Sequence, residues 1–154
     1  MHSRLFFFIL LFASGMIASA KDFSIRVQQE KDNITPGGDI PVRVLMEYPP
    51  EYQPCAWLLT AFQPDVPEEF LKALGLMEKL SRAARPEWRY VNFSTTWFPA
   101  AERAAKEKRI TLQTTEKWPP GDYRIVLRIL FRRKVSPSPG TDKYIGSPVS
   151  FTIE

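Results

Sequence analysis

Apolar and polar residues alternate in short runs along most of the chain. In FSIRVQ (residues 23–28) the odd-numbered positions are apolar and the even-numbered positions are polar. Similar alternation appears in residues 40–48 and, over a greater length, in residues 123–133. Because successive side chains of a strand point to opposite faces, each run predicts a β-strand with one buried face.

Four further stretches have strand-like composition, and AWLLTAF (56–62) is apolar on both faces, as in a central strand. Proline- and glycine-rich turns such as DNITPGG and KWPPGD separate the runs. Strands separated by such turns indicate an antiparallel β-sandwich, with a more general α+β fold as the alternative. The expected strands are, in order, 23–28, 40–48, 56–62, 88–98, 110–115, 123–133 and 148–154.

Two stretches break this rhythm with a helical one. In residues 65–85, apolar residues recur at steps of three and four, which predicts an amphipathic helix inserted into the sandwich. Gly75 weakens this helix by about 1 kcal/mol relative to alanine, and Pro86 ends it. Residues 99–108 begin with a proline suited to a first helical position and predict a second, short helix.

The first 20 residues have the composition of a secretory signal peptide. Arg4 precedes an apolar run, and the small residues Ala18-Ser19-Ala20 follow it. The apolar run is shorter than the roughly 20 residues that span a bilayer. We therefore expect export and cleavage before Lys21, to the periplasm, the cell surface or the medium.

Removing those 20 of 154 residues leaves residues 21–154, the length of one domain. The mature chain has 20 Lys and Arg against 17 Asp and Glu, because Arg4 is lost, so its net charge is +3. This excess is mild compared with that of nucleic-acid-binding domains, so no nucleic-acid partner is expected. No second apolar segment is long enough to span a membrane.

Histidine and cysteine are nearly absent, which limits the available chemistry. The single histidine, His2, leaves with the signal peptide, so the mature chain lacks the imidazole of hydrolytic triads and many metal sites. Cys55 stands alone, and its apolar neighbours predict a buried free thiol, with an intermolecular disulfide as the alternative. The sequence thus predicts no catalytic residues, no metal and no cofactor.

Carboxylate pairs are the one enzymatic route that remains, as in glycosidases. The candidate pairs are Glu47 with Glu51, Glu68 with Glu69, and Glu116 with Asp122. Their spacing does not favour catalysis over solubility, so a small carboxylate-dependent hydrolase is retained only as a second alternative.

An arginine recurs at every fourth position of the longest expected strand, at Arg124, Arg128 and Arg132. Residues four apart in a strand share a face, so the row lies opposite the apolar face of that strand. It is either a solvated surface that pairs with carboxylates of neighbouring strands or, together with Arg133 and Lys134, a binding surface for an acidic protein partner.

Aromatic residues near strand ends and turns suggest a carbohydrate-binding surface as the first alternative. The candidates are Trp88, Trp118 and Tyr52, whose flat rings would stack on sugars. Trp97 has the parity of Val91 and is expected in the core instead.

Several of these segments resemble immunoglobulin-like and fibronectin type III-like sandwiches of exported proteins. TPGGDIPVRV resembles the turn and second strand of such domains, WPPGDYRIVLRI the entry to their penultimate strand, and SPVSFTI their closing strand. The resemblance implies that the Tyr123 hydroxyl ties a corner to nearby backbone and that Trp57 is buried. It implies a fold and no particular function.

The sequence therefore predicts an exported, non-catalytic β-sandwich that binds a protein partner or serves as an envelope accessory. Its Asn33 and Asn92 lie in N-glycosylation sequons, which matter only in a eukaryotic secretory pathway.

Overall fold

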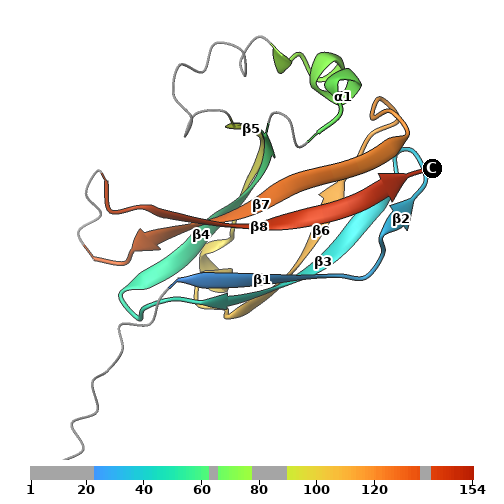
Figure 1. Ribbon diagram of the computed structural model, residues 1–154. Helices are drawn as coiled ribbons and strands as arrows, with labels where there is room; N and C mark the ends of the chain where they lie inside the picture. Colours follow the sequence, from blue (N-terminus) through green and yellow to red (C-terminus); the bar gives the residue numbers. More distant parts are fainter. Residues whose placement is uncertain (1–22, 63–65, 78–89, 136–139) are drawn as a thin grey trace, which may run out of the picture.

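Two stacked β-sheets form the protein (Figure 1). The computed structural model describes residues 23–62, 66–77, 90–135 and 140–154. One sheet has the order β1 (Ser24–Gln29), β3 (Asp39–Glu47), β6 (Glu107–Gln113). The other has the order β2 (Asn33–Ile34), β8 (Lys143–Ile153), β7 (Gly121–Arg133), β4 (Tyr52–Phe62), β5 (Tyr90–Trp97). Neighbouring strands are antiparallel except β2 and β8, so the predicted antiparallel β-sandwich is confirmed.

All seven predicted strands are present, and β2 adds a short eighth strand inside the DNITPGG turn. The alternation of β7 has the predicted effect, because its odd-numbered apolar side chains are buried in the core between the sheets. Burying five such side chains is worth on the order of 8–15 kcal/mol before the entropy of folding is subtracted. The buried side chains of this face are Tyr123, Ile125, Leu127, Ile129 and Phe131.

Tyr123 fixes the entry to β7. Its hydroxyl donates a hydrogen bond to the backbone carbonyl of Pro119, four residues earlier, and its ring stacks on Phe151 with 5.2 Å between centroids. Trp118 and Phe70 complete this aromatic end of the core. Burial raises the pKa of Tyr123 to about 12.

This pKa predicts a pH-dependent stability. The unfolded chain releases the Tyr123 proton near pH 10, whereas the folded protein retains it to about pH 12, so the contribution of Tyr123 is complete below pH 10 and declines as pH rises toward 12. Tyr123→Phe is expected to lower the free energy of unfolding by about 1–2 kcal/mol at pH 8 and by less at pH 11. Urea titrations of both proteins at the two pH values measure this difference, and a pH-independent difference would contradict the assignment. Tyr144→Phe, at an exposed ring, is the control.

The helix predicted for residues 65–85 is much shorter within the described residues. The helix α1 (Glu68–Ala73) ends at Leu74, because Gly75 adopts a φ of 66°, which breaks the helical hydrogen bonding. Phe70 and Leu71 still anchor this segment in the core. Residues 65 and 78–85 lie outside the described residues.

The helix predicted for residues 99–108 is also wrong in extent. Only the 3-10 turn η2 (Ala100–Glu102) forms. The chain then returns to the sheet, where the Met46 amide donates a hydrogen bond to the Lys106 carbonyl and β6 begins at Glu107. The pairing of β6 with β3 overrides the local helical preference of the alanine-rich sequence.

Trp97 does not lie in the core, because β5 contains a bulge. Leu59 pairs with Ser94 and Thr60 pairs with Asn92, so Phe93 is an extra residue of β5. The insertion reverses the parity of the following residues, and Trp97 faces solvent with 55% of its surface exposed.

The N-terminal residues 1–22, which contain the predicted signal peptide, lie outside the described residues, as does Trp88. In the described part of the chain, no helix has the length and apolarity needed to cross a membrane.

Candidate functional site

The outer face of the five-stranded sheet carries a row of four residues, one from each of four adjacent strands. Trp97 of β5 pairs with Ala56 of β4, Ala56 with Leu130 of β7, and Leu130 with Tyr144 of β8. With strands about 4.8 Å apart, the two aromatic residues are about 14 Å apart at their Cα atoms. The row therefore has a small apolar floor between two aromatic ends.

The apolar floor of this row is buried from solvent, although it lies outside the main core. Cys55, Ala56, Leu58 and Leu130 form a separate buried cluster, none more than 5% exposed. In contrast, Trp97 and Tyr144 are 55% and 46% exposed, and they are two of the three large apolar side chains that are exposed among the described residues. Large rings at the ends of a buried apolar floor supply contact area at little cost in side-chain entropy.

Two arginines of β7 flank this row. Arg132 donates hydrogen bonds from Nε and Nη2 to the two carboxylate oxygens of Asp142, at 3.2 and 2.9 Å, and its guanidinium lies 5.8 Å from the Trp97 ring centroid. Hydrogen bonding to Asp142 raises the pKa of Arg132 further, so this side chain is charged at every accessible pH. Arg128 lies 5.6 Å from the Tyr144 ring centroid. Each aromatic ring thus has a cation at its face. We call Ala56, Trp97, Arg128, Leu130, Arg132 and Tyr144 the aromatic–arginine patch.

Beside this patch, the same face has a hollow of about 310 Å³. Arg124 and Arg128 stand on either side of Val126, and Gly146 contributes no side chain. A Cβ on Gly146 would lie 2.8 Å from Val126 Cγ1 and 3.3 Å from Arg128 Cγ, so the glycine is required by this close approach. Phe62 and Pro148 complete the wall.

This close approach predicts that Gly146→Ala lowers the free energy of unfolding by about 1–3 kcal/mol, because the stiff Val126 side chain must move. In the double variant with Val126→Ala, the contact is absent, and alanine at position 146 should cost less than about 0.5 kcal/mol. Chemical denaturation of the four proteins of this cycle measures the coupling. Additive effects of the two substitutions would show that the contact does not limit position 146.

The arginines predicted as a binding row lie where the alternation places them. Arg124, Arg128 and Arg132 share the outer face of the sheet. Arg132 pairs with the carboxylate of Asp142, as expected if the row were a solvated surface. Arg133 and Lys134 do not extend the row. Arg133 lies 6.0 Å from the Tyr52 ring centroid, and the Lys134 amide bonds to the Glu51 carbonyl at the end of the strand.

Two of the three aromatic residues predicted to bind glycans, Trp118 and Tyr52, are buried, and the third, Trp88, lies outside the described residues. Trp118 is 5% exposed, because it packs against Phe70 at 4.6 Å between ring centroids. Tyr52 is 9% exposed and contacts Phe23 edge-on at 4.8 Å. Both rings stabilise the sandwich and are inaccessible as sugar platforms, which corrects the prediction for these two residues.

The two exposed rings are not among the residues that the sequence pattern predicts at the surface. Strand parity predicts that Trp97 lies in the core, and the bulge at Phe93 that reverses this parity has no glycine or proline to mark it. The sequence predicts a loop at Tyr144, whereas β8 begins five residues earlier than predicted, at Lys143. The alternation of Tyr144, Gly146 and Pro148 with Ile145, Ser147 and Val149 was the signal available for this extension.

The thiol of Cys55 is buried beneath the patch, as predicted, and is 2% exposed. Burial raises the pKa of Cys55, so the neutral thiol is favoured. The group therefore behaves as a small apolar residue in the floor of the patch.

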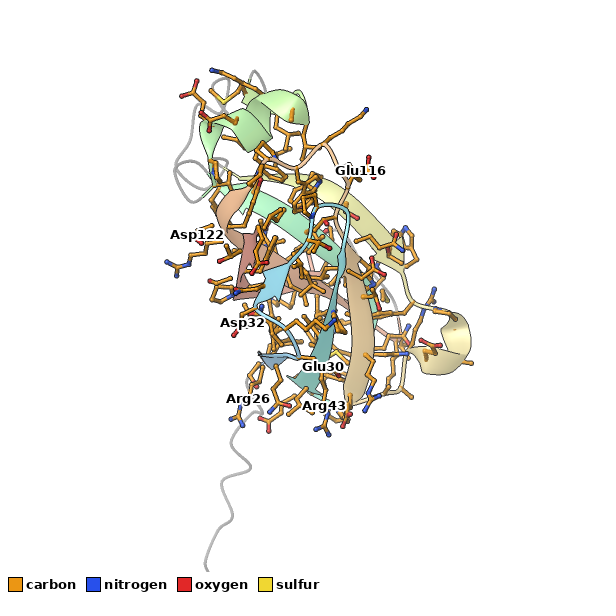
Figure 2. The ribbon with its side chains drawn as sticks, turned by 90° about the vertical axis from the view of Figure 1, so that its right-hand side faces the viewer. Arg26, Glu30, Asp32, Arg43, Glu116 and Asp122 are labelled. Carbon is orange, nitrogen blue, oxygen red and sulfur yellow. The ribbon has the colours of Figure 1, made fainter. Side chains whose placement is uncertain are left out.

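Several carboxylates considered for hydrolysis have other partners in the described residues. Glu68 pairs with Lys72 at 2.7 Å on the exposed face of α1. Glu116 and Asp122 lie on different sides of the molecule in Figure 2. Asp122 accepts a hydrogen bond from the Thr152 hydroxyl at 2.7 Å, and Glu47 accepts one from Ser24 at 3.5 Å.

The outer face of the other sheet is also charged, but its charges are mixed in sign. A groove of about 520 Å³ lies there, lined by Arg26, Leu45 and Glu47. Arg43, labelled with Arg26 in Figure 2, forms a two-point ion pair with Glu107 at 2.6 and 2.7 Å. Exposed pairs of this kind contribute little stability, and this face has no exposed aromatic ring among the described residues.

Comparisons with known proteins give no functional assignment. No protein-family model matches the chain, and no curated protein matches it significantly. Among solved structures, the crystal structure of Spo0M, a sporulation control protein from Bacillus subtilis, is similar with a TM-score of 0.43 and 13% sequence identity. The similarity covers 86% of this chain and about half, 49%, of that one.

Proposed function

We propose that the protein is an exported, non-catalytic binding module that recognises a protein partner through the aromatic–arginine patch. The observation that carries this proposal is the row in which exposed Trp97 and Tyr144, each beside an arginine, enclose a dry apolar floor. Tryptophan, tyrosine and arginine are the residues that most often dominate protein-binding energy, and they do so where a buried apolar contact is ringed by polar groups.

The Arg132–Asp142 pair supports this role because it positions the cation. Two parallel hydrogen bonds hold the guanidinium in one orientation, so its ordering entropy is already lost before a partner binds. In the described residues, the outer face of the five-stranded sheet is the face on which arginines lie beside exposed aromatic rings. Such a face is complementary to a partner surface with carboxylates around an apolar centre.

An evolutionary relation to immunoglobulin-like or fibronectin type III-like domains is part of the proposal. The order β1-β3-β6 against β8-β7-β4 corresponds to the arrangement of such sandwiches, with strands A, B and E facing strands G, F and C. The hydrogen bond from Tyr123 to the Pro119 carbonyl supports the relation.

Site-specific photocrosslinking in the native host tests the binding surface. A photoreactive phenylalanine analogue at position 97 should capture a defined partner, and the same analogue at Thr111, which is exposed on the other sheet, should not. Arg132→Glu in the first protein should suppress the captured product. Equal capture from both positions, or none from position 97, would argue against the patch.

Glycan binding is a second candidate function, with the exposed rings of Trp97 and Tyr144 as the residues that would stack on sugars. It predicts that oligosaccharides change the tryptophan fluorescence and that Trp97→Phe, with its smaller ring, reduces this change. No fluorescence response across a broad glycan panel would remove the candidate.

A further inference from the structure

The edge of β8 that faces away from β7 is only partly covered in the described structure. β2 pairs with Thr152 and Ile153 alone. Next along the edge, the Gln29 side-chain amide donates to the Ser150 carbonyl at 2.7 Å and accepts from the Ser150 amide at 3.3 Å. From Tyr144 to Pro148, no strand among the described residues pairs with this edge.

The contacts of Ser150 show which backbone groups point outward. Backbone groups of alternate residues in a strand point the same way. Because the N–H and C=O of Ser150 point away from β7, those of Tyr144 and Gly146 do too, as does the C=O of Pro148. This leaves a short template of two amides and three carbonyls for an added strand.

The hollow on the outer face lies directly beside this template. Gly146 and Pro148 belong to both, and Arg128 pairs in register with Gly146. An added strand would lie about 4.8 Å from β8, so a residue opposite Gly146 would be about 10 Å from the Arg128 Cα. Glutamate and arginine side chains together span that distance, and at Gly146 no side chain stands between them.

We propose that the β8 edge from Tyr144 to Pro148 binds an extended acidic segment of a protein partner by strand addition. The segment's backbone pairs with Tyr144 and Gly146, and one of its carboxylates enters the hollow between Arg124 and Arg128. This inference rests on the proposed protein-binding function and specifies the chemistry of the partner.

The charges near the edge favour an acidic peptide over a second copy of this chain. Two of the residues that line the hollow, Arg124 and Arg128, are basic, and the other described residues that line it are uncharged. Pairing of two β8 edges in a dimer would bring the Arg128 side chains of both copies together. Lys143 and Pro148 at the ends of the template limit the length of the added segment.

A capped peptide, acetyl-Thr-Glu-Val-Glu-Val-Glu-Thr-amide, is a suitable probe for the full mature protein labelled with ¹⁵N. The expected result at millimolar peptide is a change in the Tyr144 and Gly146 amide shifts together with slower hydrogen exchange at both. The peptide with Gln in place of each Glu should bind about 10-fold more weakly. Unchanged amides at both positions, or equal binding of the two peptides, would overturn the proposal.

Two variants at one position separate strand addition from contact with the ring. Tyr144→Ala and Tyr144→Pro both remove the ring, but only proline also removes the outward N–H. Strand addition predicts that Tyr144→Pro binds the peptide about 10-fold more weakly than Tyr144→Ala, with unchanged cooperative unfolding in both. Equal affinities would overturn the edge proposal alone, whereas failure of the photocrosslinking from position 97 would count against the patch.

Sedimentation tests whether a second copy of the chain occupies the edge. A dimer that Tyr144→Pro dissociates would identify a second copy as the occupant and would contradict the proposal that an acidic segment binds there.

Discussion

Replacing Phe70 with alanine is expected to lower the free energy of unfolding by about 3–5 kcal/mol. Phe70 is fully buried and lies edge-on to Phe93, Trp118 and Tyr123, at 5.7, 4.6 and 5.3 Å between ring centroids. The truncation removes these contacts and leaves a cavity where α1 meets the sandwich. Urea unfolding followed by tryptophan fluorescence measures the change.

The matched control is Lys72→Ala in the same helix. Lys72 is exposed and pairs with Glu68 across one helical turn, so its loss should leave the free energy of unfolding nearly unchanged. A loss below about 1 kcal/mol in Phe70→Ala would show that α1 is only loosely attached to the sandwich.

Replacing Trp97 with alanine is expected to weaken binding of the captured partner by about 30-fold or more while leaving the fold intact. Trp97 is 55% exposed and lies outside both buried clusters, so its stability contribution is small. Central aromatic residues of an interface commonly contribute 2 kcal/mol or more, which corresponds to about 30-fold in affinity. Titration calorimetry with the purified partner provides the affinity, and thermal unfolding verifies the fold.

Arg109→Ala is the control for this prediction. Arg109 is an exposed residue of β6 on the opposite sheet, where no contact with the partner is expected. If Arg109→Ala weakened binding as much as Trp97→Ala, the binding surface would have been placed on the wrong sheet.

The fold was largely predictable because the apolar alternation that defines each strand is local in sequence. The buried face of β7 and the shared face of Arg124, Arg128 and Arg132 follow from strand parity alone. The exposure of Trp97 does not, because it depends on a bulge that is set by how β5 pairs with β4.

The candidate site was predictable only in part for a similar reason. The arginines recur at every fourth residue, which is visible in the sequence. Their neighbours Trp97 and Tyr144 lie about 30 and 15 residues away in the chain, and only the register of the sheet brings them beside β7. Gly75 weakens the predicted helix, and its positive φ ends α1 there. The low helix propensity of glycine thus indicated where the helix could end, and the packing of the folded chain determined that it does end there.

The most direct measurement of the central claim is the set of backbone amide shifts of the ¹⁵N-labelled protein on addition of the partner captured from position 97. Binding through the aromatic–arginine patch predicts that the shift changes concentrate in residues 95–97, 128–132 and 142–146. Changes confined to β3 and β6 of the other sheet would contradict it.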